Sequence, residues 1–217
     1  MSKRVKQNTN RFYEGVRAVA SVLLRVFFRV TYEGLEQIPQ DQGYLLCCNH
    51  RSYLDAFFIG YKIPVALRFV AKDSLFRFGP LRWFITKMGA FPIKRGTKDE
   101  KAFDTAGEIL RGGGALVIFP EGTRSLEGKL LTFKAGAALM AAQTGADVLP
   151  VGLSWAGRLR PFKKITVRYG SLLTSEQLGL TDVSRQKLKA ATGMIAQAVG
   201  ALVDPQPGDA AAAQAEE

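Results

Sequence analysis

Short apolar runs alternate with segments of helical character from Tyr32 onward, and this alternation constrains the fold more than any other feature of the 217 residues. An apolar run of about five residues has the length of a buried strand, whereas helices need about ten or more. Strands separated by helices predict an α/β fold with a single central mixed β-sheet flanked by helices. Strands are expected at 44–48, 65–71, 90–93, 115–119, 148–154 and 165–169. Helices are expected at 52–63, 74–88 with a break near Gly79-Pro80, 98–111, 133–144 and 184–203.

The N-terminal segment combines bases with a wide apolar face. On a helical wheel the polar side chains of 11–30 fall within about a third of the circumference, and apolar side chains cover the rest. The longest uncharged run, 18–24, is far shorter than the roughly 20 residues of a spanning helix, and arginines interrupt the stretch where a signal peptide would be apolar. Residues 1–31 are therefore expected to form an amphipathic helix in a membrane interface, with packing on the protein's own core as the alternative.

The charge of the chain points to an anionic partner. Its formal net charge is +11, and the last 14 residues hold four acids and no base, so that the first 203 residues carry +15. Such a surplus favours nucleic acid, an anionic membrane surface or phosphorylated substrates. One histidine and two adjacent cysteines provide no metal-ligand spacing, so no metal site is expected. The main domain is expected at 32–203, and the alanine-rich acidic tail 204–217 is expected to be disordered.

The first candidate site is Asn-His-Arg-Ser-Tyr-Leu-Asp at 49–55, directly after an apolar strand. If a helix begins at Ser52, His50 lies on the preceding turn and Asp55 in the first helical turn. The bend of the chain can then bring the imidazole and the carboxylate together as a general base with an orienting acid. The alternative is structural, because Ser52 and Asp55 also resemble a capping box with Asp in place of Glu.

The second candidate site is Phe-Pro-Glu-Gly-Thr-Arg-Ser at 119–125, which also follows a predicted strand. Glycine lets the backbone approach a ligand, threonine and serine provide hydroxyl donors, and arginine recognises phosphate. The segment lacks the lysine and the spacing of a P-loop, and a surface turn with an ion pair is the alternative. Lys72 and Arg95 also follow predicted strands, and ligands of α/β sheets bind at strand ends.

Together these motifs resemble the ordered sequence blocks of the glycerophospholipid acyltransferases, in particular the 1-acyl-sn-glycerol-3-phosphate (lysophosphatidic acid) acyltransferase branch. The matching segments are 49–55 for the catalytic block, Lys72 with Leu75 and 89–95 for the second, 119–125 for the third and 148–151 for the fourth. They extend over about half of the chain. Two positions depart from the family pattern: Ser74 stands where an acidic residue is common, and 77–80 replaces a proline-aromatic segment.

The resemblance implies an enzyme that moves an acyl group to the free sn-2 hydroxyl of lysophosphatidic acid and forms phosphatidic acid. His50 would be the general base and Asp55 would orient it. The phosphate would be bound by Lys72, Arg95, Glu121, Gly122, Thr123 and Arg124. The donor would be acyl-CoA or acyl carrier protein, without a metal or other cofactor, and the enzyme would lie peripherally on the cytoplasmic face of the cell membrane.

Two alternatives stay open at this point. A related acyltransferase could use another lyso-lipid, such as a lyso-ornithine lipid, or glycerol 3-phosphate, because the blocks do not define the headgroup. A module of a different class could bind anionic lipid without catalysis, and such a module would tolerate the loss of His50. Nucleic acid is not expected as a partner, because the sequence shows no base-stacking motif and its most regular bases share a helix with an apolar stripe.

Overall fold

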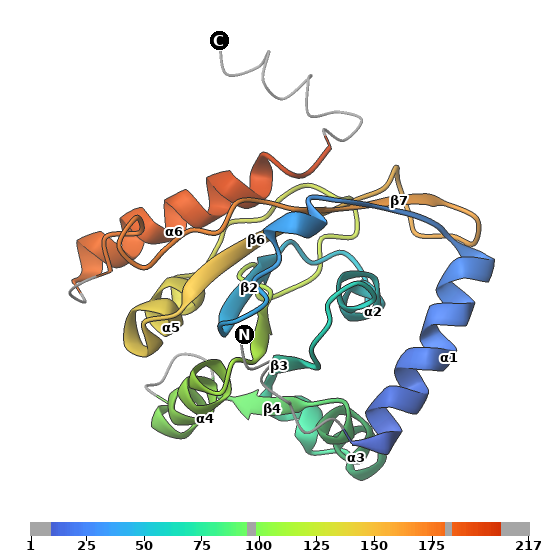
Figure 1. Cartoon of the computed structure of the whole chain (residues 1–217), viewed down its shortest axis with the longest axis horizontal. Helices are drawn as coiled ribbons and strands as arrows, with labels where there is room; N and C mark the ends of the chain where they lie inside the picture. The colour runs from blue at the N-terminus through green and yellow to red at the C-terminus, as the bar shows by residue number, and fades with distance from the viewer. Residues whose placement is uncertain (1–9, 95–98, 181–183, 205–217) are drawn as a thin grey trace.

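The computed structural model describes residues 10–94, 99–180 and 184–204, and a seven-stranded sheet forms its centre (Figure 1). The strand order is β1-β7-β6-β2-β5-β3-β4, and every neighbouring pair is parallel except the antiparallel pair β6–β7. The predicted mixed sheet is thereby confirmed. The strands are β1 (Arg29–Glu33), β2 (Tyr44–Cys48), β3 (Leu67–Lys72), β4 (Ala90–Ile93), β5 (Ala115–Ile118), β6 (Asp147–Ser154) and β7 (Lys164–Tyr169).

Helices cover both faces of the sheet (Figure 1). They are α1 (Arg11–Phe27), α2 (Asp55–Gly60), α3 (Gly79–Lys87), α4 (Glu100–Arg111), α5 (Gly136–Thr144) and α6 (Arg185–Gly200), with short 3-10 turns η1 (Leu35–Gln37) and η2 (Asp73–Phe76). The break predicted at Gly79-Pro80 separates η2 from α3, and Ser184 caps α6 by accepting a hydrogen bond from the Lys187 backbone N–H, 3.2 Å away.

The central strand β2 separates two apolar cores. Leu45 and Cys47 pack with α4, α5 and α6 on one face, whereas Leu46 and Cys48 pack with α2 and the end of α1 on the other. All five residues of β2 are buried, as expected for a parallel strand covered on both sides. The residues that follow Cys48 therefore start from a rigid position at the centre of the sheet.

The N-terminal helix ends earlier than its hydrophobic pattern suggests. The prediction of a helix over 1–31 is wrong at its C-terminal end, because α1 ends at Phe27 and residues 29–33 form β1, which pairs with β7; the first nine residues of that prediction lie outside the described residues. The β-branched and aromatic side chains of Val30, Thr31 and Tyr32 favour a strand, and pairing with β7 satisfies their backbone groups. An apolar residue such as Val30 fits both the 3.6-residue period of a helix and the two-residue period of a strand, so the helical wheel could not show where α1 ends and β1 begins.

Only two residues of helix α1 are buried against the body of the protein. Tyr13 and Leu24 are buried, and the Tyr13 hydroxyl accepts a hydrogen bond from the Leu67 backbone N–H at 3.1 Å. Its large exposed apolar side chains are Val19, Val22, Leu23, Val26 and Phe27. Within the three described ranges, no helix has both the length and the apolar character needed to span a bilayer.

Candidate active site

His50 and Asp55 form a short pair at the carboxyl end of β2. The Nδ1 atom of His50 lies 2.8 Å from Oδ2 of Asp55, and this carboxylate is fully buried while the His50 side chain is 21% exposed. When Nδ1–H donates to the carboxylate, the lone pair of the imidazole lies on Nε2. A pair with this geometry can act chemically as a general base with an orienting acid.

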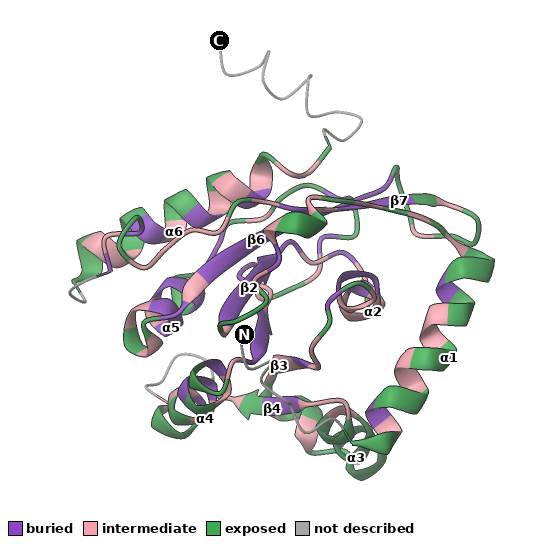
Figure 2. Ribbon diagram, in the orientation of Figure 1, coloured by how far each residue is buried: buried purple, intermediate pink, exposed green. Residues whose placement is uncertain are grey.

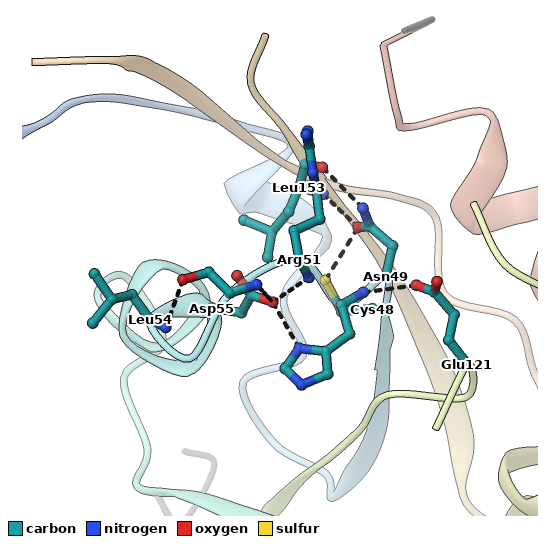
Figure 3. A network of polar contacts seen from close by, with 9 residues as sticks. Cys48, Asn49, Arg51, Leu54, Asp55, Glu121 and Leu153 are labelled. Atoms are coloured by element: carbon teal, nitrogen blue, oxygen red, sulfur yellow. Dashed lines mark hydrogen bonds and ion pairs between the residues drawn. The ribbon is translucent and has the colours of Figure 1, made fainter. Parts of the chain in front are cut away.

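The same carboxylate also organises the backbone at the start of α2 (Figure 3). Oδ2 of Asp55 accepts the backbone N–H groups of Arg51 at 2.7 Å and Ser52 at 2.9 Å, and the Ser52 hydroxyl accepts from Leu54 N–H at 3.1 Å. The two interpretations of the motif are therefore compatible, because one side chain both supports the turn and contacts the imidazole. The cost of burying the charge is offset by these donors.

The 119–125 loop fixes the backbone of His50 from the opposite side. His50 N–H donates to Oε1 of Glu121 at 2.7 Å, and Ser125 N–H donates to the His50 carbonyl at 2.7 Å. The imidazole also stacks on Phe119, with ring centroids 4.0 Å apart and planes inclined by 20°. The two predicted segments thus form one structure, in which both backbone groups and one ring face of His50 are held.

The side chain of Glu121 differs from its predicted role. It is only 2% exposed, and Oε2 accepts the Leu131 backbone N–H at 3.0 Å while Oε1 accepts that of His50. Burial raises the pKa of Glu121. A buried carboxylate that already accepts two backbone hydrogen bonds is not placed to bind a phosphate. We therefore correct the predicted role of Glu121: its side chain holds the backbone of the His50 loop in position.

Asn49 and Arg51, which flank His50, fasten the loop to β6 and were not predicted as site residues. Asn49 donates to the Leu153 carbonyl at 2.9 Å and accepts from the Leu153 N–H at 2.8 Å (Figure 3). The guanidinium of Arg51 donates to the Trp155 carbonyl at 2.7 Å and lies 4.1 Å from the centre of the Trp155 ring. Burial lowers the pKa of Arg51. The only sequence signal that Asn49 and Arg51 fasten the loop was their position as polar residues directly after a buried strand.

A cavity of about 930 Å³ extends from His50 into the protein. Among the predicted phosphate-binding residues, Lys72, Gly122, Thr123 and Arg124 line it. Three further cations line the same cavity but were not predicted as ligands: Arg17, Lys94 and Lys134. Arg95 lies outside the described residues. The strand-end cations that the sequence singled out thus converge, apart from Arg95, on the cavity that contains His50.

Arg124 is stacked on Tyr53, a residue that the sequence did not single out. Its guanidinium carbon lies 3.6 Å from the centre of the Tyr53 ring, and its Nη2 donates to the Tyr53 hydroxyl at 2.9 Å. Tyr53 is 78% exposed, so core packing does not explain its aromatic ring. Both residues line the cavity beside His50.

Comparison with known proteins identifies the family. The profile of the family described as Acyltransferase matches residues 29–154, more than half of the chain, including His50, Asp55 and the 119–125 loop. The chain belongs to the acyltransferase family. Its match begins at β1 and ends with β6, so this acyltransferase domain includes both segments that hold His50.

Named acyltransferases are among the similar proteins. The chain is 33% identical over 145 residues to the chloroplastic 1-acyl-sn-glycerol-3-phosphate acyltransferase LPAT1 of Arabidopsis thaliana, which covers 65% of this chain and 40% of that protein. It is 28% identical over 173 residues to the 1-acyl-sn-glycerol-3-phosphate acyltransferase of Bacillus subtilis, with coverage of 77% and 84%. The chain thus spans less than half of the chloroplast relative and most of the bacterial one.

A solved acyltransferase has a similar fold. The 1-acyl-sn-glycerophosphate (LPA) acyltransferase PlsC from Thermotoga maritima superposes with a TM-score of 0.64 at 26% identity. The match covers 92% of this chain and 85% of that chain. The similarity therefore extends beyond the 29–154 segment, over nearly the whole chain.

Proposed function

We propose that this acyltransferase moves a fatty acyl group from a thioester to the sn-2 hydroxyl of lysophosphatidic acid and forms phosphatidic acid. The observation that carries the proposal is the His50–Asp55 pair, 2.8 Å apart, in the wall of a cavity that is also lined by Lys72 and Arg124. A base and phosphate-binding cations in one cavity suit an acceptor that contains both a hydroxyl and a phosphate. The names of the relatives support this acceptor.

In the proposed reaction, His50 removes the proton of the acceptor hydroxyl through Nε2. The hydroxyl oxygen attacks the thioester carbonyl, the new ester C–O bond forms and the C–S bond breaks. The proton taken by His50 passes to the departing thiolate, so that the products are phosphatidic acid and a free thiol. Asp55 keeps Nδ1 protonated and stabilises the imidazolium that forms between the two transfers. The balance is complete without a covalent acyl-enzyme.

Cations at the strand ends bind the acceptor phosphate in this proposal. Lys72 follows β3, and Arg124 lies in the loop after β5 together with Gly122 and Thr123. Guanidinium groups bind phosphate through two parallel hydrogen bonds, which would hold the hydroxyl within reach of His50. We keep Arg95 as a predicted ligand, because in the sequence it comes two residues after the end of β4, the strand that neighbours β3.

The apolar part of the cavity suits an acyl chain. Its lining there includes Leu24 of α1, Phe69 of β3, Phe84 of α3 and Met140 of α5. The donor in this proposal is acyl-CoA or acyl carrier protein, both of them anionic thioester carriers that suit a basic protein, and no other cofactor takes part. Because the acceptor is a membrane lipid, we further propose that α1 lies with Val22 and Val26 in the cytoplasmic face of the membrane, as in a peripheral protein.

Thiol release from oleoyl-CoA by the purified protein in detergent tests this function. Release should require lysophosphatidic acid and yield phosphatidic acid. His50→Ala should lower the rate by about 10²- to 10⁴-fold, the range for loss of a general base. His50→Asn is the matched variant, since its amide can still donate to Asp55 but has no base at the Nε2 position; it should be equally inactive with an unchanged unfolding midpoint.

Three results would count against the proposal. An active, folded His50→Asn protein would remove His50 as the base. Release with glycerol 3-phosphate or lyso-ornithine lipid but not with lysophosphatidic acid would change the acceptor. No release with any acceptor, from either acyl-CoA or acyl carrier protein, would favour a module that binds anionic lipid without catalysis.

A further inference from the structure

Helix α3 is exposed to an unusual degree for a helix of a compact domain. None of its nine residues is buried (Figure 2). Large apolar side chains are nevertheless exposed there and just before it: Phe78, which precedes α3, is 66% exposed, Leu81 37% and Trp83 55%, while Leu75 of η2 (43%) and Phe84 (37%) are exposed in part and also line the His50 cavity. Exposed apolar side chains gathered in one patch mark an interaction surface, whereas scattered ones do not.

The charge around this patch has one sign. Between Asp73 and Asp99 the sequence contains six bases and no acid. At helical spacing Arg82, Trp83 and Lys87 share the side of α3 opposite Leu81 and Phe84, and Arg77 lies one residue before Phe78. Apolar and aromatic side chains next to cations are typical of segments that lie in an anionic membrane interface.

The patch is continuous with the exposed face of α1. Phe12 of α1 meets the rings of Trp83 and Phe84 edge to face, with centroids 5.0 and 6.0 Å apart. The side chain of Asn10, which caps α1, donates to the Lys87 carbonyl at 2.9 Å. Helix α3 therefore lies at the N-terminal end of α1 (Figure 1), and the exposed valines of α1 continue the same surface away from it.

Side chains of the same segment also line the His50 cavity. Leu75, Phe84, Ile85 and Met88 all contribute to the cavity wall. The segment from η2 to α3 thus contributes side chains both to the cavity wall and to the exposed patch. Anything that binds the patch lies close to the space proposed for the acyl chain.

We propose that η2 and α3 form a second membrane-contact element, which enters the interface of an anionic bilayer beside α1. Phe78 and Trp83 enter the acyl region, and Arg77, Arg82 and Lys87 contact lipid phosphates. The inference rests on the proposed membrane association of α1. It adds a second point of membrane contact at the N-terminal end of α1, whereas β1 follows the C-terminal end of that helix. With two contacts the cavity wall formed by α3 lies at the bilayer, from which the lyso-lipid is drawn.

The chain carries its own reporter for this contact, because Trp83 and Trp155 are its only tryptophans. Trp155 is 5% exposed, whereas Trp83 is 55% exposed. Vesicles of phosphatidylglycerol and phosphatidylcholine with brominated acyl chains should shift the Trp83 emission to the blue and quench it. Trp83→Phe should remove the quenched component and leave the emission of Trp155.

Paired variants separate the two contacts in a flotation assay with the same lipids. The double substitution Phe78→Ser and Trp83→Ser should weaken binding to the vesicles about tenfold or more, because two large apolar side chains that would be buried in the bilayer are lost. Val22→Ser with Val26→Ser tests α1, and Met194→Ser, which removes an exposed apolar side chain from α6, is the matched control. Acyl transfer to lysophosphatidic acid in detergent should be unchanged by the Phe78 and Trp83 substitutions, so membrane contact and activity are measured separately.

Each alternative result overturns the proposal in a distinct way. If vesicle binding requires Val22 and Val26 but Trp83 is not quenched, α1 is the contact and α3 is not. If none of the apolar substitutions lowers binding, the membrane role of both helices is wrong while the acyltransferase activity stands. A shift of Trp83 emission on addition of acyl carrier protein, or with rising protein concentration, but not with vesicles would assign the patch to a protein partner.

Discussion

The His50–Asp55 pair and the cations of the same cavity are held in opposite ways. His50 is fixed by hydrogen bonds to both of its backbone groups, by a carboxylate on Nδ1 and by the Phe119 ring. Lys72 is exposed at the end of β3, and Arg124 rests on an exposed tyrosine. One part of the site is built into the sheet, whereas the other lies on its surface.

The difference matches what each part does in the proposed reaction. Proton transfer depends on distance and angle within fractions of an ångström, so a base gains from a rigid backbone and a fixed ring. Attraction between a cation and a phosphate falls off slowly with distance, and several cations can share the charge. Substitutions in the rigid part should therefore lower kcat, and substitutions among the cations should act mainly through the KM for the acceptor.

Asp55→Asn is expected to have the largest effect of the substitutions around His50. The amide cannot stabilise the imidazolium and can hold the ring in the wrong tautomer, so kcat should fall by about 10²- to 10³-fold. Steady-state kinetics of thiol release measures this, with the acceptor KM expected to stay within about threefold.

Ser52→Ala is the control for this substitution. It removes a hydroxyl that accepts from Leu54 N–H but leaves the contact between His50 and Asp55. Loss of such a capping contact costs about 1 kcal/mol of stability and should leave kcat nearly unchanged. Equal losses of kcat in Ser52→Ala and Asp55→Asn would mean that Asp55 acts only through the turn.

Arg124→Ala tests the exposed part of the site. Loss of a hydrogen bond from a charged group costs about 1.5–3 kcal/mol, which corresponds to a rise of about 10- to 100-fold in the acceptor KM. Arg185→Ala in α6 is the control, because it changes the net charge by the same amount at a residue outside the cavity. It should have little effect on the acceptor KM. If Arg124→Ala left KM unchanged, the phosphate would be bound elsewhere.

Glu121→Gln tests the rigid part of the site, and it should change both kcat and the pH dependence of the stability. Gln can accept from only one of the two backbone donors, so kcat should fall about tenfold as His50 shifts. The folded protein binds the Glu121 proton more tightly than the unfolded chain, because burial raises the pKa of Glu121. Its contribution to the free energy of unfolding therefore decreases as the pH rises from about 4 through the raised value.

Urea unfolding at several pH values measures this effect. The stability difference between wild type and Glu121→Gln should be largest at acidic pH and should decrease toward neutral pH. A difference that grows with pH would mean that the carboxylate is stabilised in its charged form. An unchanged kcat would mean that Glu121 is dispensable for the position of His50.

Apart from β1, the strands and the order of the motifs along the chain were predictable, because they depend on local patterns, and the position of the motifs at strand ends predicted that they meet at one edge of the sheet. The run 44–48 has the length and composition of a buried strand, and parallel strands bring their carboxyl ends to one edge. The role of Glu121 was not predictable. The sequence around it, with hydroxyl side chains and an arginine, would be the same whether its carboxylate faced a ligand or, as in the structure, two backbone N–H groups. Strand β1 was missed because its partner β7 is distant in the sequence.

Tyr53 was missed for a related reason, and it provides the smallest predicted effect. Nothing local marks this tyrosine, because its partner Arg124 lies 71 residues away. Stacking of a guanidinium on an exposed ring is worth about 0.5–1 kcal/mol, so Tyr53→Ala should raise the acceptor KM about two- to fivefold with little change in kcat. Tyr53→Phe keeps the ring and should recover most of this loss. In an Arg124→Ala background, Tyr53→Ala should have no further effect, and a full additional loss there would show that Tyr53 acts independently of Arg124.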